Sequence, residues 1–334
     1  MREQYIDCIR IVCAYSVVLL HSTAYAVYDY NGKMFDAFVL LNTFTRLAVP
    51  LFFMCSGAVI LKSGFKIEQL FKRVKRIVYP LIFWSIFYEI YLIYCGLNKS
   101  ILDAINDILH DRVMYHMWFL YALLGIYLLI PFLHKMVQGM DSKDWKWFWK
   151  FSISIILIKT IMTLCHSYIP ASFTMIPISI VYVMAGYYLS HFESPISKTY
   201  VQAGGAFASI IIVGVLTIHS SHVSGKYIES FINLDNFFIY LGAGFAFLLF
   251  KNLSKILNNS FVLNTIGNLK DITYFCYLSH VLILDILYSK IYLYNYYTCD
   301  YPIVASVALS ILTFVVCIIL GLLIKRVPFL NIII

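Results

Sequence analysis

Ten runs of predominantly apolar residues, each 16 to 25 residues long and separated by charged or turn-rich breaks, dominate the sequence. A helix needs about 20 residues to cross a hydrocarbon core roughly 30 Å thick, and in lipid it must satisfy its own backbone hydrogen bonds. The sequence therefore predicts an all-α integral membrane protein, a bundle of about ten transmembrane helices. The expected spans are residues 8–27, 37–61, 77–95, 116–134, 147–167, 175–190, 203–218, 234–250, 272–289 and 303–324.

Composition agrees with a membrane protein, because 61% of the residues are hydrophobic and only 13% are charged. An ordinary soluble domain has about 25% charged residues. No Gly/Ser-rich or Pro-rich linker and no repeat of fixed period interrupts the chain. We therefore expect a single membrane domain over residues 1–334, with no soluble appended domain.

Basic residues alternate between the breaks and so predict the topology. Seventeen cations fall in one set of breaks and five in the other. Basic loops stay in the cytoplasm, so both termini should be cytoplasmic. The net charge of +8 is then explained by topology, and no nucleic-acid partner is expected. The larger set is Arg2, Lys62, Lys66, Lys72, Arg73, Lys75, Arg76, Lys135, Lys143, Lys146, Lys150, Lys198, Lys251, Lys255, Lys270, Lys325 and Arg326.

The first span carries a polar stripe formed by Asp7, Arg10, Ala14, Val17 and His21, which follow helical steps of three and four. Arg10 and His21 are about 16 Å apart along such a helix, with Arg10 nearer the cytoplasm. Either the Arg10 side chain extends to the cytoplasmic interface and pairs with Asp7, or Arg10 has a role in a functional site within the membrane. His21 suits a general base, because a neutral imidazole accepts a proton near physiological pH.

Two further charged residues lie at a similar depth to His21, namely Arg46 and Glu89. If the helices adjoin, Glu89 orients His21, and Arg46 binds an anion or stabilises oxyanion charge. The alternative is a plain buried ion pair, which membrane interiors also tolerate.

Polar residues on two later spans complete the outer group. His116 and Trp118 open one span on the same side, and Tyr277, Ser279 and His280 lie in the middle of another. They either bind substrate or join helices through hydrogen bonds, which is the better explanation for Ser279. No pair of histidines four residues apart and no H-E-x-x-H pattern occurs, so no metal site is expected.

On the cytoplasmic side, Arg73 and Arg76 lie one helical turn apart and either grip phosphates or bind anionic lipid headgroups. They belong to the amphipathic segment 62–76, which we expect to lie along the inner membrane surface. Cys95 and Cys299 both fall near the outer surface, and we expect them to remain unpaired.

Five stretches of the sequence carry a resemblance to the bacterial membrane-bound acyltransferase 3 family. They are Asp7-Cys-Ile-Arg10 with His21, the run Ala48–Gly57, Arg73-x-x-Arg76 with Pro80, the run His116–Tyr121 leading to Pro131, and Tyr277-Leu-Ser-His280. Each alone is weak, whereas five in order on the expected spans are specific. One departure is Ile11, where many members have glycine after the first-span arginine.

The resemblance implies a multi-pass enzyme of the bacterial cytoplasmic membrane. Its co-substrate is acyl-coenzyme A, acetyl in the first instance, with no bound cofactor, and its acceptor is a hydroxyl of a surface or lipid-linked glycan. The resemblance also implies an essential histidine at His21, an arginine at Arg10, and donor contacts from Arg73 and Arg76. The chain looks most similar to members that O-acetylate polysaccharides such as enterobacterial common antigen.

These observations predict an O-acyltransferase; the alternative is a transporter or flippase lined by the same charges, and a sensory module comes third. The sequence leaves open the acceptor, the acyl group, the choice between general-base and acyl-histidine chemistry, and the oligomeric state. Besides acyl-coenzyme A and the glycan acceptor, the expected partners are membrane lipids. The predicted catalytic residues are His21, Arg10 and Glu89, and the predicted binding residues are Arg73, Arg76, Arg46, Asp7, His116, Trp118, Tyr277 and His280.

Overall fold

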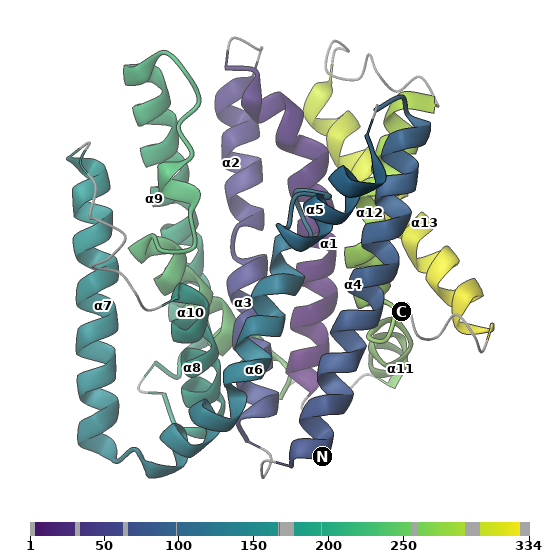
Figure 1. The fold of residues 1–334 in the computed structure, drawn as a ribbon. Helices are drawn as coiled ribbons and strands as arrows, with labels where there is room; N and C mark the ends of the chain where they lie inside the picture. The colour runs from purple at the N-terminus through teal and green to yellow at the C-terminus, as the bar shows by residue number, and fades with distance from the viewer. Residues whose placement is uncertain are drawn as a thin grey trace.

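The computed structural model describes residues 4–30, 34–62, 66–97, 99–165, 167, 177–194, 196–255, 260–290 and 301–327, which contain helices and no strand (Figure 1). A short 3-10 helix at Ser230–Ile232 precedes α10. The α-helices are α1 (Gln4–Tyr28), α2 (Phe35–Thr45), α3 (Ala48–Ile60), α4 (Ile67–Tyr94), α5 (Ile101–Leu109), α6 (Trp118–Gly139), α7 (Ser142–Leu164), α8 (Ile178–His191), α9 (Thr199–Ser224), α10 (Phe237–Leu253), α11 (Ser260–Leu269), α12 (Thr273–Lys290) and α13 (Pro302–Lys325).

The expected all-α membrane fold is confirmed. Among the described residues, eight helical segments are long and apolar enough to cross a membrane. The predicted spans 175–190 and 272–289 form the shorter helices α8 and α12. Every predicted span thus contains helix among the described residues, although α8, with 14 residues, is shorter than the roughly 17 that a full crossing requires.

The predicted span 37–61 is broken into α2 and α3, with the break at Arg46 and Leu47. Pro50 explains the position of the break. A helical residue normally donates its N–H to the carbonyl four residues earlier, and proline has no N–H to give to Arg46. The break therefore places Arg46 where the helix is interrupted.

The segment 62–76 was expected to lie along the membrane surface, and this is wrong for its described part. Helix α4 runs without interruption from Ile67 to Tyr94. Leu70 is buried and packs in a small cluster with Ile60 and Ile130, which fixes the first turns of α4 against the bundle. The basic residues of this segment are consequently part of a long helix that enters the bundle.

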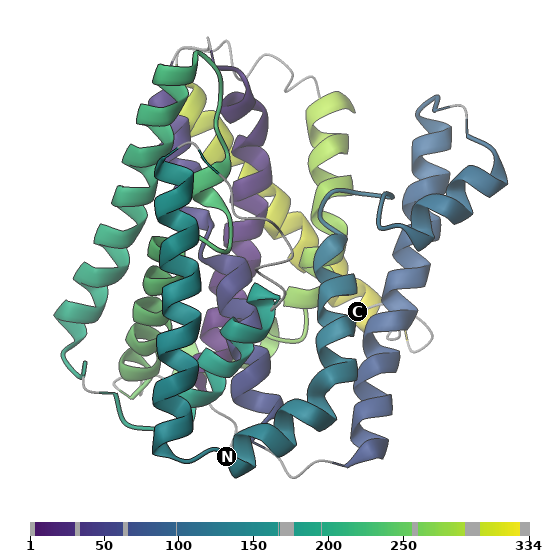
Figure 2. The ribbon, with the colours of Figure 1, turned by 60° about the vertical axis from the view of Figure 1, so that its left-hand side comes forward.

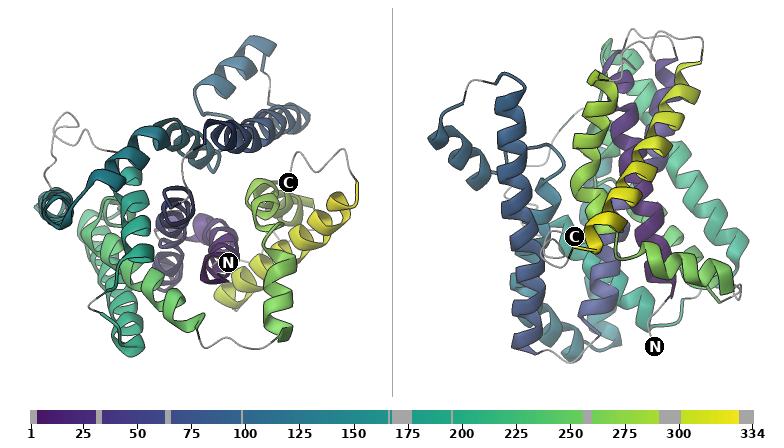
Figure 3. Two further views of the ribbon diagram at one scale, coloured as in Figure 1. Left: turned by 90° about the horizontal axis from the view of Figure 1, so that it is seen from below. Right: turned by 90° about the vertical axis from the view of Figure 1, so that its right-hand side faces the viewer.

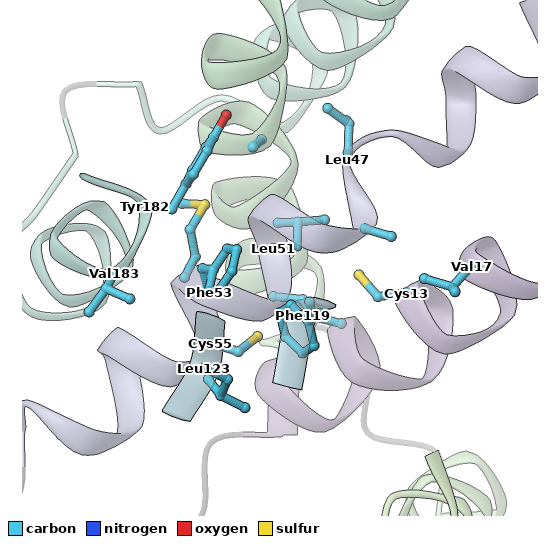
Figure 4. Close-up of a cluster of buried hydrophobic side chains, with 14 of the residues drawn as sticks. Cys13, Val17, Leu47, Leu51, Phe53, Cys55, Phe119, Leu123, Tyr182 and Val183 are labelled. Carbon is cyan, nitrogen blue, oxygen red and sulfur yellow. The ribbon is translucent and has the colours of Figure 1, made fainter. Parts of the chain in front are cut away.

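Helices α1 and α3 lie in the centre of the bundle when it is seen along its axis (Figure 3, left). Helices α4 and α5 stand to one side (Figure 2). Cys13 of α1, Cys55 of α3 and Phe119 of α6 belong to one large buried cluster in this core (Figure 4). The central position of α1 exposes its polar stripe to other helices rather than to lipid.

Two glycines bring α3 and α8 into backbone contact. A Cβ atom on Gly57 would lie 1.8 Å from the Val183 carbonyl oxygen, and one on Gly186 would lie 1.9 Å from that of Met54. Small residues permit this close approach, which is a common basis of helix association in lipid. The contact holds α3 in place beside α1.

Candidate active site

A cavity of about 890 Å³ opens at the end of the bundle where the N-terminus lies, at the bottom of Figure 1. We call it the basic cavity. Its volume lies within the range of about 300–1,000 Å³ that is usual for ligand sites. Asp271 is the one acidic residue among the described residues of its lining, and it pairs with Lys325 at 2.9 Å. Its basic lining residues are Arg10, Arg73, Lys75, Arg76, Lys270 and Lys325.

The excess of cations over acids suits the basic cavity to a ligand with several negative charges. Arg73 and Arg76 come from α4 and Arg10 comes from α1, so the predicted donor-side arginines face one space. Tyr274 also lines this space, and its hydroxyl is buried without a hydrogen bond to any described residue.

A second cavity, of about 250 Å³, lies farther along α1 and contains His21. We call it the histidine cavity. Tyr115 contacts the His21 ring, with ring centroids 4.9 Å apart. Ser22 of α1, Tyr91 of α4, and Asp285 and Tyr288 of α12 also line it, and the Tyr91 hydroxyl donates a hydrogen bond to the Asp285 carboxylate. The proposed base therefore faces a space large enough for a small group.

A buried layer separates the two cavities. On α12, Tyr277 lines the basic cavity and Val281 lines the histidine cavity, while His280 between them is 0% exposed. The same order holds near the start of α6, where Phe119 lines the first cavity, Tyr115 lines the second, and His116 and Met117 are buried. On α1, Ala14 and Val17 are buried between Arg10 and His21.

Three histidines meet at this layer. The His21 ring stacks on His280 with centroids 5.2 Å apart, and His280 contacts His116 edge-on at 5.1 Å. The Tyr277 hydroxyl donates to the backbone carbonyl of His116 and so ties α12 to the start of α6. The sequence prediction that His116, Tyr277 and His280 join the neighbourhood of His21 agrees with these contacts.

Glu89 is not placed as expected. Its carboxylate accepts hydrogen bonds from Lys99 Nζ, at 3.2 Å to each oxygen, and Lys99 also binds Asp107 at 2.7 Å. Partial burial acts to lower the pKa of Lys99, but its hydrogen bonds to Asp107 and Glu89 outweigh that effect and hold the pKa above its usual value. Because Glu89 is committed to Lys99 and lines neither cavity, it does not orient His21.

Arg46 and Trp118 also lie outside the two cavities. Arg46 donates from Nε and Nη2 to the Asn42 side-chain oxygen, at 2.9 and 2.7 Å. Trp118 is 38% exposed at the start of α6, and its ring packs edge-on against Phe119. Asp7 is buried at 5% exposure near the start of α1. These hydrogen bonds tie the Arg46 side chain to the last turns of α2.

Sequence reasoning missed several lining residues. Lys75, Lys270 and Lys325 join the basic cavity, although their sequence positions indicated only topology. In the sequence, Asp285 is an isolated carboxylate within a predicted span. In the structure its partner is Tyr91 of α4, and both residues line the histidine cavity. Their pairing depends on which faces of α4 and α12 meet.

Among the described residues, no group of three or more histidine, cysteine, aspartate or glutamate side chains has an arrangement that could hold a metal ion. Cys95 lines the histidine cavity, whereas Cys299 lies outside the described residues. The expectation that these two cysteines remain unpaired therefore stays a prediction.

Comparison with known proteins identifies one family. A family model for an acyltransferase domain, the acyltransferase 3 type, matches residues 3–322. A protein of Enterococcus faecalis called amino-acid racemase is 26% identical over 121 residues, which are 35% of this chain and 16% of that protein. The chain thus covers only a small part of that relative's length. No solved structure matches the chain.

Proposed function

The chain belongs to the acyltransferase 3 family and is a membrane acyltransferase, and we propose that it moves an acyl group, acetyl in the first instance, from acyl-coenzyme A to a hydroxyl of a surface or lipid-linked glycan. The placement of the two cavities at different depths along α1 carries this proposal. One cavity suits a polyanion, and the other presents a histidine.

The donor occupies the basic cavity in this proposal. Coenzyme A carries several phosphate charges on a long flexible arm, and its phosphates suit the guanidinium groups of Arg10, Arg73 and Arg76. Loops with an excess of positive charge stay in the cytoplasm, and this supports assigning this end of the bundle to the cytoplasmic side. The arm extends along α1 across the buried layer, a rise of about 16 Å from Arg10 to His21.

The acceptor hydroxyl enters the histidine cavity. Its oxygen attacks the thioester carbonyl carbon, the bond from carbon to sulfur breaks, and coenzyme A leaves as the thiolate. His21 accepts the hydroxyl proton and returns it to that sulfur. The buried layer must shift for the thioester to reach this point, because His116 and His280 close it in the present structure.

Supplying labelled acetyl-coenzyme A to membrane vesicles tests the proposal. Label should appear on the glycan fraction, and His21→Ala should lower the rate by about 10²- to 10⁴-fold, the usual contribution of a general base. His219→Ala is the matched control, since His219 is exposed on α9 away from both cavities. Retained transfer in His21→Ala, or glycan movement without labelling as a transporter would give, contradicts it.

The covalent variant of the chemistry has its own signature. If His21 formed an acyl-histidine intermediate, labelled coenzyme A would exchange into acyl-coenzyme A without any acceptor. Direct transfer with His21 as base predicts no exchange under the same conditions. Measuring exchange in vesicles depleted of glycan therefore separates the two.

A further inference from the structure

Asp285 is an ionisable residue of α12 that the transfer chemistry leaves without a role. Its carboxylate lies in a helix expected to lie within the membrane, where a charged group costs roughly 2.5–3.5 kcal/mol on insertion scales. Such residues are usually retained for a function or a partner. Asp285 lines the histidine cavity, so it faces the same space as His21.

The contacts of Asp285 leave part of its carboxylate available. The Tyr91 hydroxyl donates to Oδ2, which fixes the orientation of the group. The hydroxyl of Ser289 bonds the backbone carbonyl of Asp285 at 2.7 Å and not its side chain. Among the described residues nothing bonds Oδ1, and no hydrogen bond or ion pair joins Asp285 to His21.

The rest of the lining restricts the kind of ligand. Among the described residues, His21 is the only basic side chain that lines the histidine cavity, whereas Tyr91, Tyr115 and Tyr288 line it with aromatic rings. A ligand with its own negative charge would be repelled by the Asp285 carboxylate, and no lysine or arginine among the described lining residues faces it there. A neutral group with hydroxyls and an apolar ring face suits both the carboxylate and the tyrosines.

The volume limits the size of that ligand. At about 250 Å³ the cavity lies below the usual range of roughly 300–1,000 Å³ for drug-sized ligands. A single sugar ring is of suitable size, and a longer glycan would extend outside it.

We propose that Asp285 is the acceptor-binding residue of this enzyme, and that it selects a neutral sugar by accepting a hydrogen bond from the hydroxyl next to the one acylated. This inference rests on the proposed acyl transfer to a glycan. Asp285 Oδ1 binds one hydroxyl while the neighbouring hydroxyl faces His21. Tyr91 acts as a positioning residue that holds the carboxylate.

Competition by simple sugars tests this selectivity. Methyl glucoside and methyl glucuronide have the same ring, and only the second is anionic. Both are added during labelling of membrane glycan from acetyl-coenzyme A. In the unmodified enzyme, methyl glucoside should inhibit at a concentration roughly tenfold or more below methyl glucuronide, because the carboxylate of the glucuronide would be repelled by the Asp285 carboxylate in the same cavity. Equal inhibition, or none by methyl glucoside, overturns the proposal.

Variants assign the effect to Asp285. Asp285→Asn should weaken inhibition by methyl glucoside and remove the discrimination between the two sugars, while the KM for acetyl-coenzyme A stays unchanged. Tyr91→Phe should weaken methyl glucoside inhibition and keep the discrimination, because the charge remains; it also tests the assignment if Asp285→Asn does not fold. Unchanged inhibition in a folded variant contradicts the assignment. If the unmodified enzyme labels no glycan at all, the proposed function fails instead.

Discussion

The ring of His21 stacks on that of His280, with centroids 5.2 Å apart and planes inclined by 28°. His280 Nδ1 lies 2.7 Å from the Tyr277 carbonyl and 3.1 Å from the Cys276 carbonyl. Carbonyls only accept hydrogen bonds, so Nδ1 carries the proton of the neutral ring and Nε2 is its unprotonated nitrogen. The backbone of α12 thereby fixes the ring against which His21 packs.

Removing the His280 ring should slow transfer. An aromatic pair contributes about 0.5–1.5 kcal/mol beyond its burial, so His280→Ala should lower the initial rate of glycan labelling by roughly two- to tenfold. His280→Phe keeps a ring for His21 to pack on and should retain more activity than the alanine variant. A rate for His280→Ala equal to that of the unmodified enzyme would show that the stacking does not position His21.

Neutralising the α4 arginines should weaken donor binding. Arg73→Gln and Arg76→Gln each remove a cation from the basic cavity, and each should raise the KM for acetyl-coenzyme A by roughly ten- to hundredfold. Lys72→Gln is the control on the same helix, because Lys72 is exposed and does not line the cavity. Steady-state kinetics in vesicles measures the effect. Equal KM values for all three variants would exclude the arginines from donor binding.

Adding a methyl group at Gly57 should destabilise the bundle. The new Cβ would overlap the Val183 carbonyl oxygen at 1.8 Å, which forces α3 and α8 apart. Overpacking of this kind costs about 3 kcal/mol at the upper end of its usual range, so Gly57→Ala should lower the midpoint of thermal unfolding in detergent. Gly125→Ala is the matched control, since no atom lies within 4 Å of a Cβ built there. Similar midpoints for the two variants would contradict the close contact.

Removing Lys99 should leave a buried carboxylate without its partner. Glu89 is 3% exposed, and truncation of one partner of a buried pair is strongly destabilising. Lys99 is partly exposed, so we expect a smaller loss of about 2 kcal/mol for Lys99→Met. Adding Glu89→Gln to that variant should restore much of the loss, as a double-mutant cycle measures. Strictly additive effects would rule out the pair.

The same ion pair predicts a dependence on pH. The pKa of Lys99 is raised in the folded protein, so the stabilisation is complete below its unfolded value of 10.5 and is lost as pH rises through the folded value. Chemical unfolding of the purified protein between pH 8 and 12 should therefore show a loss of stability that begins as pH rises above about 10.5 and that Lys99→Met lacks.

The sequence predicted the helices well because crossing a membrane demands long apolar runs, which hydropathy reads directly. It did not predict the break at Arg46, because Pro50 lies within a run that is apolar on both sides. The depth of a residue also follows from its distance to the end of a span. Arg10 and His21 could therefore be assigned to different depths on one helix.

The partners of polar residues were harder to predict, because depth does not give the direction in which a side chain points. Glu89 binds Lys99, which follows α4 in the chain, rather than His21. Asp285 and Tyr91 come from α12 and α4, and only the packing of those helices brings them together. Long-range pairs of this kind need the fold itself.

The buried layer of His116, Met117 and His280 also affects the membrane as a barrier. Two hydrated cavities that joined across the bundle would form a path along which protons leak down their electrochemical gradient. Closure by this layer, with Tyr277 tied to the His116 carbonyl, keeps the water on the two sides apart. Under the proposed function, acyl groups leave the cytoplasm through this protein. Between transfer reactions the closed layer prevents protons from leaking through it, so the proton gradient is preserved.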